Sequence, residues 1–116
     1  VKRKIRLTRF TDYMRVRRLG KSYAHPLLVL VSLPNDTESS RFAVSAGRSV
    51  GNAVQRNRAK RLIRAALHLL LSFIPPGWDI ILIARRPLAS ATFAQTQTAL
   101  RQLLQRAGLI ISVHAS

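Results

Sequence analysis

The segment from about Asn52 to Ser72 constrains the fold of this chain most strongly. At 100° per residue its polar side chains fall within one arc of about 140°, in the order Arg56, Lys60, Arg64, Asn57 and Arg61. The opposite arc carries the apolar residues Leu62, Leu69, Ala66, Ala59, Leu70 and Ile63. This pattern predicts a long helix with one face in a core and one cationic face. Arg58 lies between the two arcs, at the expected edge of the core.

The cationic face has no acidic partner in its own helix. The whole chain carries 20 Lys and Arg against 4 Asp and Glu, a formal net charge of +16. Like charges at i,i+4 spacing destabilise a helix by a few tenths of a kcal/mol per pair, so an external countercharge is needed. A phosphate backbone supplies it, and arginine binds phosphate oxygens bidentately. The charge pattern therefore favours a nucleic-acid partner over a merely solvated face.

Shorter segments predict the elements around this helix. Apolar residues recur every third position from Leu7 to Leu19, which predicts an amphipathic helix that Gly20 ends in the left-handed conformation. Residues 27–33 and 42–46 predict an antiparallel hairpin, residues 78–84 a strand buried on both faces, and residues 92–107 a last helix. The order helix, strand, strand, helix, strand, helix predicts an α+β fold, a two-layer α/β sandwich. We expect one domain over residues 1–116, with a basic arm at 1–6 and a tail at 109–116.

The phenylalanines named below and the tryptophan are expected to pack in the core. Phe10, Phe42 and Phe93 fit buried positions, and Trp78 fits a core anchor. Tyr23 lies near a loop, and its sequence position leaves packing and RNA contact equally open.

The sequence offers no constellation for catalysis or metal binding. It contains no Cys, which excludes thiolate chemistry and disulfides. Asp12, Asp36, Glu38 and Asp79 are widely spaced, and the three His lack metal-ligand spacing, so no catalytic residue and no metal site are predicted. Asp79 is expected to be either a polar residue at a strand edge or a partner for a neighbouring arginine. Without an apolar run of about 20 residues or a signal peptide, we expect a cytoplasmic protein with no membrane partner.

One block carries a resemblance to a known family. Residues 51–64 contain Arg56-Asn57-Arg58 followed by Lys60-Arg61-Leu62-Ile63-Arg64, and this block resembles the signature of the bacterial ribonuclease P protein subunit. The likeness continues through Asp12 to Val16 with Gly20, the strand after Pro26, Phe42 to Ser45, and Asp79 to Arg85, in the family's order. It covers nearly the whole chain.

The resemblance implies a fold and a function. The fold is similar to the second domain of ribosomal protein S5, with a left-handed β-α-β crossover, against the usual rule. The function is to bind ribonuclease P RNA and the 5′ leader of precursor tRNA, and to assist endonucleolytic removal of that leader. In this family the RNA subunit and its Mg²⁺ ions perform the hydrolysis, and the protein alone is inactive. No small-molecule ligand is expected.

The resemblance also implies two sets of site residues. The positions expected to bind the catalytic RNA are Asn52, Arg56, Asn57, Arg58, Lys60, Arg61 and Arg64. The positions expected to bind the leader are Tyr13, Arg17, Val31 and Arg48. Tyr13 matches a family aromatic, a stacking platform for an unpaired base. Arg17 and Val31 stand where the family has aromatic residues, so leader binding here is expected to depend more on phosphate contact.

A second interpretation of the sequence is that the chain is a ribosomal-type or architectural nucleic-acid-binding protein without a catalytic partner. Such a protein would share this charge and size. Preference for an unpaired 5′ leader over a duplex discriminates between the two readings, because a stacking aromatic on the first helix favours single strands.

Overall fold

The computed structural model describes residues 6–110; the predicted arm and tail therefore lie largely outside the described residues. Seven helices and strands follow one another, namely α1 (Phe10–Leu19), β1 (Lys21–Ala24), β2 (Leu28–Pro34), β3 (Arg41–Ser45), α2 (Ala53–Leu70), β4 (Trp78–Ala84) and α3 (Phe93–Arg106). Three short 3₁₀ helices lie between them, η2 (Arg48–Val50), η3 (Leu71–Phe73) and η4 (Arg86–Ser90). The α+β class and the predicted order of elements are confirmed, with β1 as an additional strand.

The strands form one sheet in the order β1-β2-β4-β3. The expected hairpin between residues 27–33 and 42–46 is wrong, because β4 lies between β2 and β3, antiparallel to the first and parallel to the second. The reason is burial: Ile80, Ile81 and Leu82 are each 0% exposed, so β4 needs an interior position. The hairpin that does form joins β2 to β1, with Tyr23 opposite Leu30.

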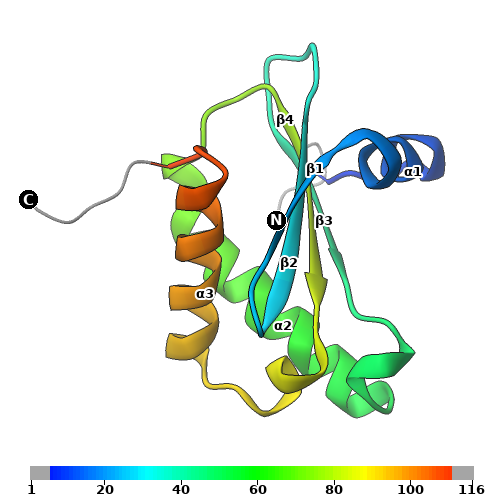
Figure 1. Cartoon of the computed structure of the whole chain (residues 1–116), viewed down its shortest axis with the longest axis vertical. Helices are drawn as coiled ribbons and strands as arrows, with labels where there is room; N and C mark the ends of the chain where they lie inside the picture. The colour runs from blue at the N-terminus through cyan, green and yellow to red at the C-terminus, as the bar shows by residue number, and fades with distance from the viewer. Residues whose placement is uncertain (1–5, 111–116) are drawn as a thin grey trace, which may run out of the picture.

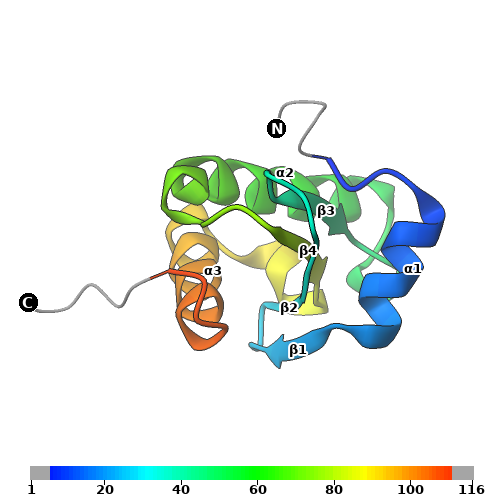
Figure 2. The same ribbon diagram turned by 90° about the horizontal axis from the view of Figure 1, so that it is seen from above.

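Helices cover both faces of the sheet. In Figure 1, α2 and α3 lie together on one face, and α1 crosses the other. Leu30, Leu82, Ile63 and Leu100 belong to the main core between the sheet and the α2–α3 layer. From β3 through α2 to β4 the connection is left-handed when viewed along the strands, as the resemblance implied (Figure 2).

A smaller cluster lies between α1 and the opposite face of the sheet. It contains Leu7, Val16, Val31 and Ile81, all buried. Leu7 was expected to begin the first helix, but its N–H donates to the carbonyl of Phe42 at 2.8 Å, so the chain runs extended beside β3 before α1 begins. This contact places the residues just before α1 at the outer edge of the sheet.

Gly20 joins α1 to β1 in a different way from the one expected. Its φ of −73° is extended rather than left-handed. A Cβ at this position would lie 2.5 Å from the carbonyl oxygen of Val16 and 2.7 Å from Val31 Cγ1. Glycine is therefore needed for the close approach of the end of α1 to β2.

Three apolar residues expected in the core are exposed. Phe10 is 76% exposed, Leu69 53% and Phe93 38%, whereas Phe42 is buried as expected. Phe10 lies at the first residue of α1, more than one turn from Val16, which is the position that faces the sheet. Among the described residues no helix is both long and apolar enough to cross a membrane.

Candidate nucleic-acid interface

The start of α2 is fixed by a capping box. Asn52 Oδ1 accepts from the Gln55 N–H at 2.9 Å, and Gln55 Oε1 accepts from the Asn52 N–H at 2.8 Å. Gly51 precedes the cap at φ +145°, where any Cβ would collide with the Gln55 side chain. These contacts determine where the helix begins, and so which residues face the solvent. Asn52 therefore has a structural role in addition to its predicted place in the RNA-binding set.

The basic face of α2 is solvent-exposed at its centre and half-buried at one margin. Asn57, Arg61 and Arg64 are exposed, whereas Arg56 and Lys60 are half-buried. The buried side chains of α2 are Ala59, Ile63, Ala66, Leu67 and Leu70. The buried arc is thus rotated from the one expected, since it gains Leu67 and loses Leu69. The rotation brings Arg56 and Lys60 to the border of the core.

Arg58 makes contacts within the protein. Its Nη1 donates to the carbonyl of Ala89 at 2.7 Å and its Nη2 to the carbonyl of Ala91 at 3.0 Å. Both carbonyls lie at the end of η4, so the guanidinium joins α2 to the segment between β4 and α3. Of the predicted RNA-binding residues, Arg58 is the one whose donors are already directed to the protein.

A network of charges holds α1 against the sheet. Asp79 is 0% exposed, and Arg41 binds it bidentately, from Nε to Oδ1 at 2.9 Å and from Nη2 to Oδ2 at 2.7 Å. From α1, Arg15 Nη2 donates to Asp79 Oδ2 at 3.1 Å, and Asp12 accepts from Arg41 Nη1 at 3.3 Å. Asn35 Nδ2 completes the shell at 2.7 Å from Asp79 Oδ1. Of the two roles expected for Asp79, the pairing with arginine is confirmed.

This network also keeps its central guanidinium charged. The hydrogen bonds from Arg41 to Asp79 raise the pKa of Arg41 despite the opposing effect of its partial burial. Two residues of α1, one of β3 and one of β4 thus meet in a single charged cluster. The cluster fixes one flank of α1 and leaves the opposite flank free.

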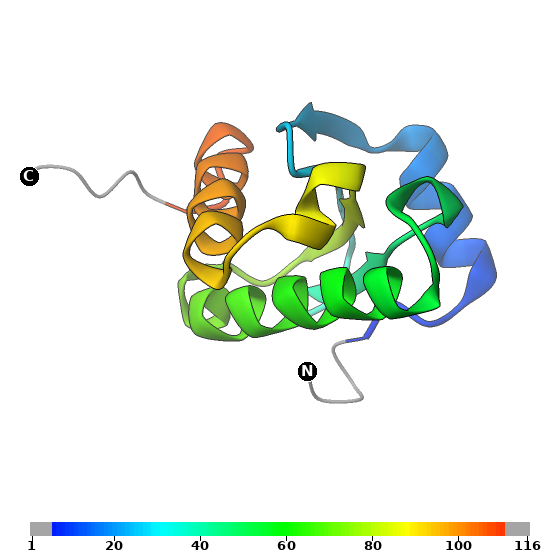
Figure 3. The same cartoon turned by 90° about the horizontal axis from the view of Figure 1, so that it is seen from below.

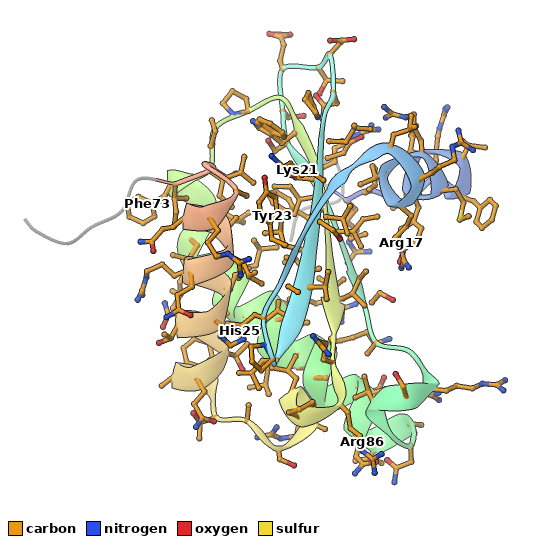
Figure 4. All side chains as sticks on the ribbon, in the orientation of Figure 1. Arg17, Lys21, Tyr23, His25, Phe73 and Arg86 are labelled. Atoms are coloured by element: carbon orange, nitrogen blue, oxygen red, sulfur yellow. The ribbon has the colours of Figure 1, made fainter. Side chains whose placement is uncertain are left out.

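The free flank of α1 carries two of the four residues predicted to meet the leader, Tyr13 and Arg17. Tyr13 is half-buried and packs on the cluster that contains Val16 and Val31. Arg17 is exposed and projects from α1 toward the end of the molecule that carries η2 (Figure 4). Arg48 is exposed on η2. The structure thus places Tyr13 and Arg17 on the side of the sheet that α1 covers, whereas Arg48 lies on η2, which packs against α2 and η4.

Val31 is the exception among the predicted leader contacts. It is 4% exposed, and α1 packs over it. A side chain that is covered in this way offers no surface to a base. Val31 therefore supports Tyr13 from beneath, and this corrects its assignment as a direct contact.

A basic hollow that the sequence did not single out lies at the end of β4. It has a volume of about 730 Å³, and its lining includes His25, Ser49, Arg85 and Arg86. Figure 4 shows His25 and Arg86 at the same end of the molecule, opposite the tip of the β2–β3 loop. The sequence signal for this hollow was the pair of arginines directly after a buried strand, because residues that follow a strand lie at one edge of the sheet.

Tyr23 lies on the other side of the sheet. It packs on the main core and points toward α3 in Figure 4, with Lys21 Nζ 5.9 Å from its ring centroid. Packing therefore accounts for Tyr23. Among residues 6–110 no group of three His, Asp or Glu side chains is placed to hold a metal ion.

Comparisons with known proteins agree with this arrangement. A family model described as Ribonuclease P matches residues 1–108. The ribonuclease P protein component of Roseiflexus castenholzii is 42% identical over 111 residues, which cover 95% of this chain and 91% of the relative. That of Herpetosiphon aurantiacus is 41% identical over 109 residues, covering 94% and 89%.

Two solved structures have the same fold. The Staphylococcus aureus RNase P protein superposes with a TM-score of 0.82 at 33% identity, covering 91% of this chain and 97% of that one. The RNase P protein from Thermotoga maritima, solved with 1-(4-fluorophenyl)-2-thiourea, superposes with a TM-score of 0.78 at 30% identity, covering 87% and 98%. The resemblance found in the sequence is confirmed.

Proposed function

The chain belongs to the ribonuclease P protein family, and on this premise we propose that it binds the RNA subunit of ribonuclease P and the 5′ leader of precursor tRNA. In this role it assists the Mg²⁺-dependent cleavage that gives the mature 5′ end of tRNA. The RNA subunit performs the hydrolysis, and the protein supplies affinity, substrate discrimination and relief of the repulsion between two RNAs. The setting is the cytoplasm.

The exposed face of α2 is the observation that carries this proposal. Arg61 and Arg64 are exposed there beside Asn57, and neither arginine pairs with a carboxylate among residues 6–110. Unpaired guanidinium groups on one rigid helix are suited to bind phosphates at fixed spacing. We assign this face to the RNA subunit, with Arg56 and Lys60 at its margin.

The leader is assigned to the side of the sheet beneath α1. Tyr13 gives one aromatic surface for an unpaired base, and Arg17 and Arg48 give cationic contacts to the leader backbone. The hollow that contains Arg85 and Arg86 continues this basic surface beyond the end of β4. With one aromatic and several arginines, the leader site is expected to discriminate weakly between bases.

Among residues 6–110 no three carboxylate or histidine side chains are placed to hold an ion together, and Asp12 and Asp79 already pair with arginines. Asp79 is enclosed by Arg41, Arg15 and Asn35, and Asp12 lies beside the same guanidinium groups. Mg²⁺ prefers carboxylates together with water and phosphate oxygens. The Mg²⁺ that the reaction needs is therefore assigned to the RNA subunit and substrate, and no step is assigned to a protein-bound ion.

Reconstitution tests the proposed function. The purified protein is mixed with a bacterial ribonuclease P RNA and a precursor tRNA at low Mg²⁺, and release of the leader is measured. We expect the protein to stimulate cleavage by the RNA and to cleave nothing alone. Failure to stimulate would contradict the proposal, and cleavage by the protein with Mg²⁺ but without RNA would overturn the division of labour.

A further inference from the structure

A second basic hollow lies at the outer edge of β3, away from α1's free flank. Its volume is about 350 Å³, and Arg6, Thr8, Phe42, Val44 and Arg64 are among its lining residues. Three separate parts of the chain meet there: the segment before α1, strand β3 and helix α2. Figures 2 and 3 show the segment before α1 beside β3, in agreement with the bridge between Arg6 and Phe42.

The position of the segment before α1 is fixed by the sheet. Leu7 is 5% exposed and donates its N–H to the Phe42 carbonyl, and Arg6 forms a parallel bridge with Phe42. Arg6 and Thr8, on either side of Leu7, are exposed. Because neighbouring residues of an extended chain point to opposite sides, the burial of Leu7 turns Arg6 and Thr8 outward together.

The hollow combines positive charge with hydrogen-bond donors. Arg6, from the segment before α1, and Arg64, from α2, both line it, and its lining contains no acidic residue. Neither arginine forms an ion pair within the described part of the chain. On the floor, Phe42 uses its outer carbonyl for Leu7, and the alternation along β3 places the N–H of Val44 on the same outer side. Guanidinium, hydroxyl and amide donors thus converge on one space.

Helix α2 extends the hollow into a row of cations. Arg56, Lys60 and Arg64 follow one another at i, i+4 and i+8, about 6 Å apart along the helix axis. Arg56 and Lys60 are half-buried and Arg64 is exposed, so the row runs from the margin of the basic face to its exposed centre. A spacing of this size resembles that of successive phosphates along one nucleic-acid strand.

We propose that the outer edge of β3 is a phosphate-binding groove, in which Arg6 and Thr8 on one wall and Arg64 on the other hold the backbone of an RNA strand. The chemistry requires a phosphodiester anion and no particular base. The strand is assigned to the RNA that α2 binds, and in naming that RNA the inference rests on the proposed function. In this proposal the basic residues of the N-terminal region bind two different RNAs: Arg6 binds the RNA on the α2 surface, and Arg17 binds the leader.

The salt dependence of RNA binding tests the groove. Arg6→Ala is compared with Arg18→Ala, which removes the same charge from an exposed position of α1 outside the groove. The affinity for ribonuclease P RNA is measured over a series of salt concentrations. Arg6→Ala should lower the slope of log K against log salt by roughly 0.7 to 0.9, the value of one phosphate contact, and Arg18→Ala should leave it unchanged. Equal slopes for wild type and Arg6→Ala would overturn the groove.

Two further variants show whether the walls act on one anion. Arg6→Ala combined with Arg64→Ala should weaken binding by a factor that differs from the product of the two single effects, because the residues share a ligand. Thr8→Val removes a hydroxyl at nearly constant shape, so it should lower affinity without changing the slope. Independent effects of Arg6 and Arg64, or no loss of affinity for Thr8→Val, would contradict a shared phosphate.

Titrations with different RNAs test which RNA supplies the strand, independently of whether the groove binds phosphate at all. The same titrations are repeated with precursor tRNA, with and without its leader. A slope change confined to ribonuclease P RNA supports the assignment, and one confined to leader-bearing precursor overturns it. The proposed function fails separately, if the wild-type protein does not stimulate cleavage in the reconstituted reaction.

Discussion

Single arginines of α2 differ in what their guanidinium groups can reach. Arg61 projects into solvent, whereas Arg58 donates to the carbonyls of Ala89 and Ala91. We predict that Arg61→Ala lowers the salt slope of RNA binding by about one contact and leaves thermal stability unchanged. Arg58→Ala should leave the salt slope unchanged. It should destabilise the fold by roughly 1–3 kcal/mol, because two carbonyls lose charged donors.

Urea unfolding and RNA titration of both variants measure these effects. Arg58→Lys is the matched control, since an ammonium group keeps the charge but cannot bind two carbonyls as a planar fork does. It should retain the wild-type salt slope and remain less stable than wild type. A reduced slope with normal stability in Arg58→Ala would show that this residue contacts RNA instead.

Tyr13 is the one aromatic side chain at the predicted leader positions. We predict that Tyr13→Ala weakens binding of precursor tRNA to the reconstituted enzyme by about 1–3 kcal/mol, the usual contribution of one stacked base. Binding of mature tRNA, which lacks the leader, should change much less. Equal losses for both ligands would remove Tyr13 from the leader site. Tyr13→Phe is the control, because it keeps the ring and should bind as wild type does.

Helix α1 depends on the sheet for its position, and the charged cluster at Asp79 supplies the connection. Asp79→Asn replaces a carboxylate oxygen that accepts from Arg41 and Arg15 with an amide N–H₂, and leaves Asp12 as the remaining counterion of both guanidinium groups among the described residues. We predict a loss of about 3 kcal/mol of unfolding free energy, at the lower end for a broken buried pair because both arginines are partly exposed. Asp36→Asn, in an exposed loop, is the matched control and should be neutral.

Activity measurements on Asp79→Asn show whether the charged cluster determines the position of α1 or only stabilises the fold. At a temperature where the variant remains folded, a displaced α1 should raise the KM for leader-bearing precursor and leave binding of the RNA subunit by α2 unchanged. An equal loss of both activities would indicate global unfolding. Unchanged KM in a folded variant would show that the cluster does not determine the position of Tyr13.

At the scale of the whole molecule, the net charge of +16 opposes folding. Within residues 6–110 the ion pairs gather at Asp12 and Asp79, so most arginines have no internal counterion. We predict that sulfate raises the melting temperature above its value in chloride at equal ionic strength, because a divalent anion binds arginines in the folded arrangement. Arg6→Ala combined with Arg64→Ala should reduce this difference. Equal melting temperatures in the two salts would contradict anion-linked folding.

The sequence by itself determined the element types, the cationic face of α2 and the family. These follow from periodicity and charge, which are local properties of the chain. It also placed β4 correctly as a doubly buried strand, because residues 80–84 form a continuous apolar run rich in β-branched side chains. Strand β1 went unnoticed, since four residues with one half-buried side chain carry little pattern.

Tertiary structure alone decided which segments became neighbours. Insertion of β4 between β2 and β3 follows from competition for the most buried place in the sheet, and no local pattern encodes that competition. The same folding turned Arg58 toward η4, covered Val31 with α1 and brought Arg6 beside Arg64. A sequence shows which side chains carry charge, but the distances between them, which govern whether they bind one phosphate or several, arise only when distant segments pack together.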